Sequence, residues 1–457
     1  MTQESVDAVE EKGIIAAAGG VARVGGEIDY EKFLDCVHCG LCTAACPTYL
    51  ETGDENNSPR GRIYLMRSVV DGRLELTPKV EEHLDLCLDC RSCETACPSG
   101  VQYGRLIEPF RASQRKAAAA AGRPENADWF HRWILYGLFP FPNRMRWALG
   151  PAKLMQKLGL DRLLEATGLN RLLPARLRRM QRFLPRLVPG GPPLPEFLPA
   201  IGTRRARVAL FIGCVADAVF RHTHWATARV LQQNGCEVVI PRGQACCGAI
   251  HYHSGADAPA LDLAQANARV FEAADVEAVI VNVAGCGSML KDYGHIAHEL
   301  QPQNAQLHET LGRCASKMKD VSEFLAELGL VRPTGEIKLR AVYQDACHLG
   351  HAQRVREQPR ELLAQVPGLE IVPIAEADIC CGAAGSYNLT EPEMSDRLAA
   401  RKLANLVAAK PHAVITGNVG CSMQIQAALR QAGRDVWVAH PMEVLDLSYR
   451  GLRPPVV

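Results

Sequence analysis

The stretch Cys36-Val-His-Cys39-Gly-Leu-Cys42-Thr-Ala-Ala-Cys46-Pro47 decides the architecture of this chain, because its spacing occurs twice. The second copy is Cys87-Leu-Asp-Cys90-Arg-Ser-Cys93-Glu-Thr-Ala-Cys97-Pro98. In a CxxCxxCxxxCP run, three closely spaced thiolates hold one [4Fe-4S] cluster and the fourth Cys serves the other cluster of the pair. The sequence therefore predicts two [4Fe-4S] clusters with crossed ligands. The predicted ligand sets are Cys36, Cys39, Cys42 and Cys97 for one cluster, and Cys87, Cys90, Cys93 and Cys46 for the other.

A pair of structural zinc sites is the alternative interpretation, since CxxC pairs also bind Zn²⁺. Zinc takes four thiolates from two such pairs. It gives no reason for the third Cys of each motif or for the Pro that follows the fourth. The duplicated spacing therefore favours iron-sulfur clusters.

The composition indicates a multidomain protein with reduced thiols. The chain has 457 residues, 47% of them hydrophobic, which is enough for several cores. Its 51 Lys and Arg nearly balance 50 Asp and Glu, so the net charge of +1 indicates no class of partner for the chain as a whole. Its 18 Cys favour metal-binding thiols over disulfides.

No segment reads as a signal peptide or a membrane span. The apolar run from Gly13 to Val21 is short and follows Glu10, Glu11 and Lys12. No later run reaches membrane-spanning length. We expect a cytoplasmic protein, either free in the cytosol or peripheral on the inner face of the membrane.

Both cysteine motifs fall in a predicted ferredoxin-like domain at residues 29–125, after a lead-in at 1–28 that we expect to be mobile. Between the motifs lie 40 residues that contain Ser58-Pro59-Arg60-Gly61-Arg62 and then apolar residues at helical spacing. This pattern predicts a helical insert. Arg60, Arg62 and Arg67 stabilise reduced clusters by their charge, pair with a partner protein, or belong to a solvated helix face, and these interpretations stay open.

Residues 126–203 form a basic segment that we expect to be helical and amphipathic. Between 129 and 188, twelve Lys and Arg stand against Asp161 and Glu165, a balance of +10. Short helices of this kind suit an anionic membrane surface or a groove on a partner subunit, and the alternative is that they pack between domains. Nucleic acid fits poorly, because no known binding fold frames the segment. Pro189-Gly190-Gly191-Pro192-Pro193 then marks a linker.

The rest of the chain is a duplicated domain, at 204–335 and 336–457. Four Cys recur at offsets of 133, 134, 134 and 135 residues (347−214, 380−246, 381−247 and 421−286). Strand-like runs such as Val208–Ile212 alternate with helical patterns such as Ala258–Ala274, so each copy is predicted to be an α/β domain with a parallel sheet. The recurring Cys follow strand ends, where open α/β sheets place their sites. They are Cys214, Cys246, Cys247 and Cys286, and then Cys347, Cys380, Cys381 and Cys421.

Each set of four thiols is enough for one additional iron-sulfur or other metal centre. Neighbouring side chains diverge in extended backbone, so Cys246 and Cys247 are not expected to face one corner together. An unusual cluster geometry, or one centre shared between the copies, is therefore as well supported as two ordinary clusters. Cys236 and Cys314 have no counterparts and are interpreted as ordinary buried thiols.

The double cysteine motif, the Ser58–Arg62 run and the two Cys-Cys-Gly (CCG) domains together resemble the iron-sulfur subunits of bacterial glycolate oxidases (glycolate dehydrogenases). The CCG domains alone also resemble the CCG-bearing subunits of heterodisulfide reductase and of anaerobic glycerol-3-phosphate dehydrogenase, and lactate-utilisation iron-sulfur proteins. The resemblance implies an α+β multidomain fold, with a helical double-cluster module followed by two α/β domains. Noncubane-cluster CCG domains of the heterodisulfide reductase type end in CxxC. Here Met289 and Gln424 replace the final Cys, which argues against a five-thiolate site and disulfide reduction.

The chain has no GxGxxG after a strand, no P-loop and no nucleophile elbow. Oxidation of a 2-hydroxy acid needs a flavin or nicotinamide, because an iron-sulfur cluster takes single electrons. The resemblance therefore implies an electron-transfer subunit without catalytic residues, with FAD-binding glycolate oxidase subunits as partners and a quinone or another acceptor, at or near a membrane. The alternatives are the corresponding subunit of a lactate or glycerol-3-phosphate dehydrogenase, or a heterodisulfide reductase-like catalytic subunit.

Overall fold

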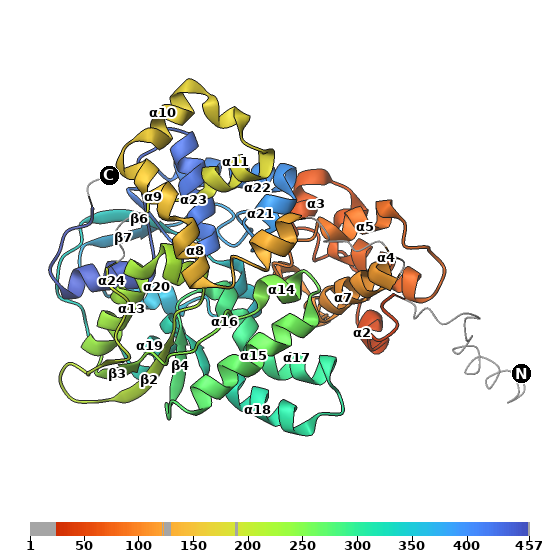
Figure 1. Ribbon diagram of the computed structural model, residues 1–457, viewed down its shortest axis with the longest axis horizontal. Helices are drawn as coiled ribbons and strands as arrows, with labels where there is room; N and C mark the ends of the chain where they lie inside the picture. Colours follow the sequence, from red (N-terminus) through yellow and green to blue (C-terminus); the bar gives the residue numbers. More distant parts are fainter. Residues whose placement is uncertain (1–23, 121, 123–128, 188–190, 456–457) are drawn as a thin grey trace, which may run out of the picture.

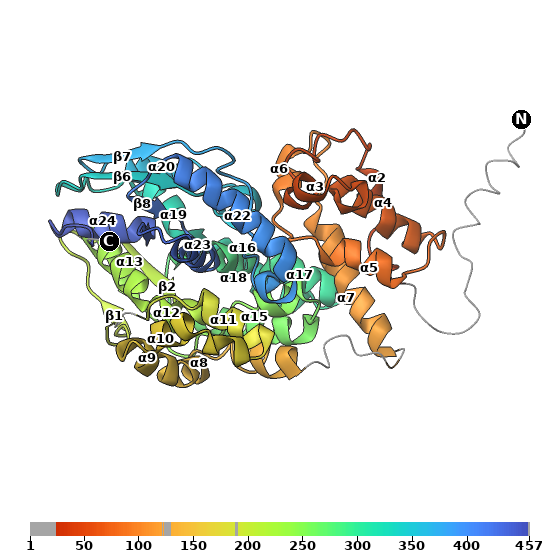
Figure 2. The same ribbon diagram turned by 90° about the horizontal axis from the view of Figure 1, so that it is seen from above.

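The computed structural model describes residues 24–120, 122, 129–187 and 191–455. The predicted lead-in at 1–28 therefore lies outside the described residues except for 24–28. The architecture is α+β, as expected, with a helical N-terminal module, a helical connecting segment and two α/β domains (Figures 1 and 2). The N-terminal module occupies one end of the molecule and the two α/β domains fill the other. None of the helices in the described ranges has the length and apolarity needed to cross a bilayer.

The N-terminal module is built from short helices around a small core. Phe33, Met66, Leu84 and Phe110 are fully buried at its centre, and each contributes about 1.5–3 kcal/mol by leaving water. The expected helical insert is α4. The helices are α2 (Glu31–Leu34), α3 (Pro47–Thr52), η2 (Glu55–Asn57), α4 (Pro59–Val70), α5 (Pro78–Asp85), α6 (Ser92–Ala96) and α7 (Gly104–Ala120).

The Ser58–Arg62 run starts α4 by local chemistry. The Ser58 hydroxyl accepts a hydrogen bond from the Gly61 N–H (3.0 Å), and Pro59 fills the first helical turn, where no backbone donor is needed. Gly61 lies against the Glu55 carbonyl, and a Cβ there would be 2.0 Å from that oxygen. Only glycine fits at this crossing of η2 and α4.

Arg62 is a buried crosslink of the module. It is 1% exposed and donates to the His83 carbonyl (2.7 Å) and the Thr48 hydroxyl (3.0 Å). For Arg62 the interpretation as part of a solvated helix face is therefore wrong. Arg60 and Arg67 remain partly exposed, and each pairs with a carboxylate.

The connecting segment crosses both α/β domains. Its helix α8 packs on the first domain and α11 on the second, where Arg179 pairs with Asp396 (2.9 Å). The packing alternative for the basic segment is therefore correct for α11. The elements are η3 (Phe130–Leu135), α8 (Pro142–Ala148), α9 (Gly150–Lys157), α10 (Leu160–Thr167), η4 (Leu169–Leu172) and α11 (Ala175–Phe183).

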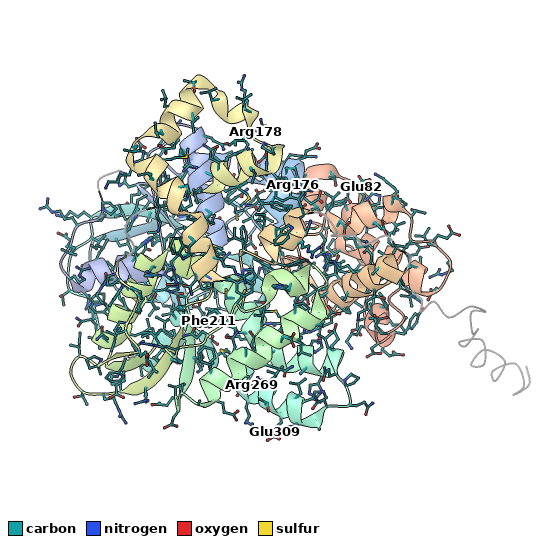
Figure 3. The ribbon with its side chains drawn as sticks, viewed as in Figure 1. Glu82, Arg176, Arg178, Phe211, Arg269 and Glu309 are labelled. Atoms are coloured by element: carbon teal, nitrogen blue, oxygen red, sulfur yellow. The ribbon has the colours of Figure 1, made fainter. Side chains whose placement is uncertain are left out.

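The first α/β domain contains a five-stranded sheet in the order β1-β3-β2-β4-β5, in which only β1 is antiparallel. Phe211 at the end of β2 is buried among its helices (Figure 3). The strands are β1 (Phe197–Leu198), β2 (Ala206–Phe211), β3 (Cys236–Val239), β4 (Ala278–Val281) and β5 (Met318–Asp320). The helices are α12 (Val215–Val219), α13 (Arg221–Gln233), α14 (Ala249–His253), α15 (Asp257–Glu272), α16 (Ala284–Lys291), α17 (Tyr293–Leu300), α18 (Ala305–Ser316) and α19 (Val321–Leu328).

The second α/β domain repeats this topology with the parallel order β7-β6-β8-β9, which matches β3-β2-β4-β5. The duplication inferred from the cysteine offsets is therefore confirmed. The strands are β6 (Leu339–Tyr343), β7 (Leu369–Val372), β8 (Ala413–Ile415) and β9 (Trp437–Ala439). The helices are η5 (His348–Ala352), α20 (Gln358–Leu363), α21 (Tyr387–Thr390), α22 (Pro392–Ala408), α23 (Val419–Gln431) and α24 (Pro441–Tyr449).

The two α/β domains pack by the same surface. Helix α13 lies on α24, and their counterparts in the other copy, α20 and α19, lie on each other. One hydrophobic core runs through both sheets, and Arg229 pairs with Asp446 across the contact (2.6 Å). The shared core fixes the two cysteine-bearing sheet edges relative to each other.

Candidate iron-sulfur centres

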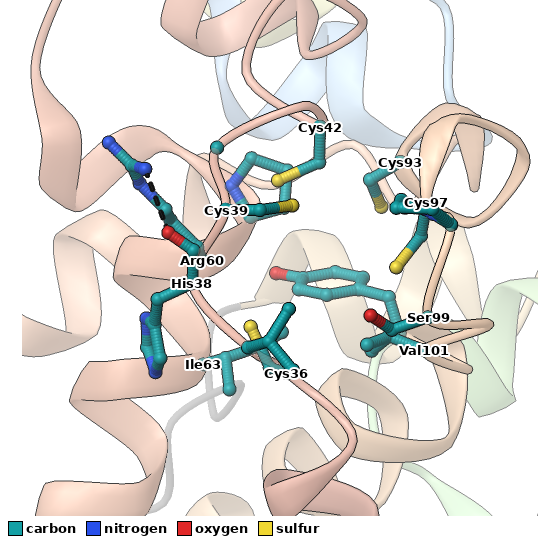
Figure 4. Close-up of a pocket in the computed structure, with 15 residues that line it drawn as sticks. Cys36, His38, Cys39, Cys42, Arg60, Ile63, Cys93, Cys97, Ser99 and Val101 are labelled. Atoms are coloured by element: carbon teal, nitrogen blue, oxygen red, sulfur yellow. Dashed lines mark hydrogen bonds between the residues drawn. The ribbon is translucent and has the colours of Figure 1, made fainter.

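A hollow in the N-terminal module is lined by the four thiols that the sequence assigns to one cluster. Cys36, Cys39, Cys42 and Cys97 surround it, and Figure 4 shows their sulfur atoms turned toward the same space. Cys39 is the exposed member of the set, so this hollow lies near the surface. Arg60 closes one side by donating to the His38 carbonyl (3.1 Å).

A second hollow lies beside the first and is lined by the other assigned set. Its four thiols are all buried, unlike those of the first hollow. Cys93 and Tyr103 border both hollows, so the two spaces are immediate neighbours. The thiols of the second hollow are Cys46, Cys87, Cys90 and Cys93.

The two motif loops repeat the same unusual backbone. His38 and Asp89, at equivalent positions, have φ values of 55° and 50°, and the next-but-one residues, Gly40 and Arg91, have 86° and 62°. Three of these are non-glycine residues in the left-handed region, which costs about 1–2 kcal/mol each. The loops keep this conformation because it curls the backbone around each hollow.

The crossing cysteines also share one conformation. Cys46 has φ −87° and ψ 114°, and Cys97 has φ −86° and ψ 115°. Each therefore leaves its own motif in the same direction, and each lines the hollow of the other motif. The residues present thus fit a pair of [4Fe-4S] clusters with exchanged fourth ligands.

Burial opposes thiolate formation at these sites. It raises the pKa of Cys42 to about 11 and the pKa of Cys90 and Cys93 well above the ordinary value. A cluster bound here would take these residues as thiolates, so its binding would release their protons. Arg62 places a positive charge beside the second hollow. Burial opposes this charge too, but the Cys87 and Cys46 thiols raise the pKa of Arg62 overall.

A buried ion network joins the second motif to the first α/β domain. Arg91, between Cys90 and Cys93, pairs with Glu108 of α7 (2.8 Å) and with Asp89 (3.2 Å). His253 of α14 reaches the same two carboxylates, at 2.9 Å from Glu108 and 3.3 Å from Asp89. Burial alone would lower the pKa of His253, but hydrogen bonds to Asp89 and Glu108 raise it to about 9. The network holds the cluster loop against α14.

In the first α/β domain the four recurring thiols meet at the carboxyl edge of the sheet. Cys214 follows β2, Cys286 lies in α16 after β4, and the adjacent pair lies in the loop after β3. The Cys214 and Cys246 sulfurs are 3.5 Å apart, and the neighbouring Cys246 and Cys286 thiols raise the pKa of Cys247 well above its ordinary value. Parallel strands that end at one edge produce this gathering.

The second α/β domain gathers its own four thiols in the same way. Cys380 contacts Cys347 and Cys381, and Cys381 contacts Cys421. All four are buried. Each domain therefore has a separate corner of four thiols, which favours one centre per domain over one shared centre.

The expectation that adjacent cysteines point apart is wrong here. Cys246 and Cys247 contact each other because they lie in a loop and not in an extended strand. The glycine after each pair turns the chain, with φ 89° at Gly248 and 85° at Gly382. The turn brings both sulfurs to one side. Away from the corners, Cys236 and Cys314 are ordinary buried thiols as expected, and burial raises the pKa of each to about 12.

The two positions that depart from CxxC have become part of the packing. Met289 is 2% exposed, and its Cε would lie 3.4 Å from a Cβ at Gly248. Gln424 donates to the Ser395 hydroxyl (3.1 Å), which in turn donates to the Gly382 carbonyl (2.9 Å). Gln424 thus supports the CCG turn from the position that a fifth thiolate would occupy. With Met289 and Gln424 at these positions, neither corner has a fifth thiol from its own motif.

The second hollow and the corners form one connected region. Cys90 packs with Cys347 and Cys380 of the second corner. Between the corners, the Asn418 side chain accepts from the Gly285 N–H (3.3 Å) and donates to the Cys421 sulfur (3.4 Å). The second hollow therefore adjoins the second corner, and Asn418 links the second corner to the first.

Several residues of this region were not recognisable in the sequence. Lys402 is 3% exposed, faces the Cys380 and Cys381 thiols, and has its pKa lowered by burial. Asn418 and Glu108 likewise carry no motif. Isolated polar residues of this kind give no pattern, because only their three-dimensional neighbours show their role.

Comparison with known proteins agrees with this geometry. Residues 32–101 match the family model for 4Fe-4S dicluster domains, and 208–291 and 341–426 match the model for cysteine-rich (CCG) domains. Residues 126–184 match a model described as the linker region of the glycolate oxidase iron-sulfur subunit.

Relatives match almost the whole chain. The probable glycolate oxidase iron-sulfur subunit of Bacillus subtilis is 41% identical over 414 residues, which cover 89% of this chain and 91% of the relative. The glycolate oxidase iron-sulfur subunit of Escherichia coli is 33% identical over 415 residues, with 90% and 93% covered. This chain belongs to the glycolate oxidase iron-sulfur subunit family.

This result confirms the expected resemblance. The chain carries iron-sulfur clusters and is a subunit of an oxidoreductase. A more distant relative is a subunit of the fumarate reductase (CoM/CoB) of Methanothermobacter marburgensis, 28% identical over 442 residues, with 94% of this chain and 76% of the relative covered.

Proposed function

We propose that this family member is the electron-transfer subunit of a flavin-dependent glycolate dehydrogenase at the inner face of the cytoplasmic membrane. In that complex a separate FAD-binding subunit oxidises glycolate to glyoxylate, which releases two electrons and two protons. The names of the relatives support the substrate. A [4Fe-4S] cluster, when bound, accepts and donates one electron at a time, so it links a two-electron flavin to a quinone or another acceptor.

The contact of Cys90 with Cys347 and Cys380 carries this proposal. It brings a ligand of the second predicted cluster into the same buried cluster as two thiols of an α/β corner. A subunit with only structural metal sites has no need of this continuity. The proposed ligands are Cys36, Cys39, Cys42 and Cys97, then Cys87, Cys90, Cys93 and Cys46, and for further centres Cys214, Cys246, Cys247 and Cys286, then Cys347, Cys380, Cys381 and Cys421.

Residues of this chain supply the surroundings that reduction requires. Arg62, Arg91 and Lys402 are buried cations next to the second hollow or the second corner. Each offsets part of the negative charge that an added electron brings into a medium of low dielectric constant. All four thiols of the second hollow are buried, so the surrounding protein limits the access of water to that site.

Anaerobic reduction of the assembled complex tests the proposal. The chain is purified from its native host with its FAD-binding partners, and the visible absorbance and paramagnetic resonance of its clusters are followed after glycolate, lactate or glycerol-3-phosphate is added. We expect glycolate to reduce the clusters of the complex and leave the isolated chain unchanged. Reduction by lactate or glycerol-3-phosphate alone would replace glycolate as the substrate. Reduction of the isolated chain would refute its role as a carrier without substrate chemistry.

A further inference from the structure

The connecting segment is held at both ends and uncovered in its middle. Helix α8 is fixed on the first α/β domain by buried Met145, and α11 on the second by buried Phe183. Residues 147–173, from the last turn of α8 to the residue before Pro174, form an arch that comprises α9, α10 and η4. In Figure 1, α10 lies at the top of the molecule with α9 below it, and in Figure 2 both lie along the lower edge, away from the N-terminal module.

The arch exposes apolar side chains that a helix in water normally buries. Trp147 is 85% exposed and Leu172 is 82% exposed, and no residue of α9 is buried. Leu154 and Leu158 are four apart and Leu169 and Leu172 are three apart, so each pair lies on one helix face. Elements α9 and η4 therefore both present apolar residues that no described part of the chain covers, and such a patch marks an interaction site.

The charge of the segment is opposite to that of the rest of the chain. Residues 129–188 carry +10, and the whole chain carries +1, so the remaining residues carry −9. Within the arch, Lys153 and Lys157 are exposed and have no ion-pair partner among the described residues. The α11 cations differ, because Arg179 and Arg182 both pair with Asp396. Figure 3 locates Arg178 at the α11 end of the arch.

The shape and the charges of the arch favour a lipid surface over a groove on another protein. The apolar residues are spread over short helical elements joined at Gly159 and Gly168, where φ is 70° and 72°. Exposed cations stand beside the apolar faces, as in helices that lie in the headgroup region with Lys side chains reaching lipid phosphates.

We propose that the arch, residues 147–173, seats this subunit on an anionic phospholipid bilayer, with Trp147 and the arch leucines in the headgroup region. This inference rests on the proposed function, which places the electron acceptor at the membrane. It assigns the membrane contact to the arch and not to the arginines of α11.

Flotation with vesicles tests the arch. The complete cluster-loaded complex and the isolated chain are mixed with phosphatidylcholine vesicles that contain or lack phosphatidylglycerol. We expect binding to the anionic vesicles that weakens with salt, because surface charge attraction is screened over about 10 Å at 0.1 M. The triple variant Trp147→Ser, Leu158→Gln, Leu172→Gln should lose at least tenfold in binding, and so should Lys153→Gln with Lys157→Gln.

Matched controls change exposed residues of the same types elsewhere. These are the triple variant Phe197→Ser, Ile201→Gln, Leu452→Gln and the double variant Lys338→Gln, Arg242→Gln, which should bind vesicles as the unchanged chain does. Equal binding by the arch variants and the controls, or no binding by the unchanged chain, would overturn the proposal. Loss of the FAD-binding partners in the arch variants would make the arch a protein interface instead. Glycolate-dependent reduction of a water-soluble dye is measured in parallel, and its failure would count against the proposed function whatever the vesicles show.

Discussion

Replacing Arg91 by Met should loosen the second cluster loop more than any surface change does. The Arg91 side chain is 7% exposed and lies among three carboxylates, with nitrogen–oxygen distances of 2.8 Å to Glu108, 3.2 Å to Asp89 and 3.7 Å to Glu94. Methionine fills much of the same volume but leaves these buried carboxylates without their main counterion. Removing one partner of a buried ion pair costs about 3–5 kcal/mol. This is a factor of roughly 10² to 10⁴ in the population of molecules whose second motif loop is detached from α7 and α14.

Hydrogen exchange of the peptide that spans residues 87–94 measures this population directly, in the cluster-loaded chain kept under anaerobic conditions. Arg73→Met is the matched control, because Arg73 pairs with Asp71 at 2.5 Å but is 53% exposed. An exposed pair contributes about 0–1 kcal/mol, so the control should change exchange less than tenfold. Arg91→Lys keeps the charge without the forked geometry and should fall between the two. Equal exchange in Arg91→Met and Arg73→Met, with the iron content retained, would refute the reasoning.

Four further outcomes follow from the same contacts. Cys97→Ser should damage the cluster of the first motif, and Cys46→Ser should damage the cluster of the second, as followed by paramagnetic resonance. If each variant instead lost the cluster of its own motif, the ligands would not be crossed. Gly382→Ala should lower the thermal midpoint and the metal content more than Gly248→Ala, because the nearest contact of the added Cβ is 2.7 Å at Gly382 and 3.3 Å at Gly248; similar losses would count against this. Since the pKa of His253 is raised to about 9, its stabilisation of the junction should be complete below about pH 6.5 and be lost as the pH rises through about 9; a pH profile that His253→Gln leaves unaltered would exclude it. A quadruple variant of the CCG pairs should lose at least one metal centre and keep the two [4Fe-4S] clusters. Iron and acid-labile sulfide counts near eight each per chain, in both the unchanged chain and the variant and without zinc, would rule out a further centre. The quadruple variant is Cys246→Ser, Cys247→Ser, Cys380→Ser, Cys381→Ser.

The sequence by itself determined the parts that depend on short spacing and on repetition. The CxxCxxCxxxCP runs predict two clusters because neighbouring thiols are brought together by the loop that carries them. The constant offsets between Cys214 and Cys347, and between Cys286 and Cys421, predict two α/β copies because a duplicated chain repeats its strands and helices in the same order. Ser58 and Gly61 act within one helical turn, and this run contributed to the family resemblance.

Only the tertiary structure decided how these parts meet. Cys90 and Cys347 are far apart in the chain, and they are joined because the N-terminal module docks on the second α/β domain, where the Tyr387 hydroxyl donates to the Leu86 carbonyl (2.9 Å). The Cys246–Cys247 contact depends on a turn whose left-handed glycine a period-two strand pattern does not reveal. Packing also divided the basic segment, since Arg179 and Arg182 of α11 pair with Asp396 while Lys153 has no such partner among the described residues. The net charge of the segment is a property of its composition. Which of its charges face solvent depends on residues more than 200 positions away, as the separation of 217 between Arg179 and Asp396 shows.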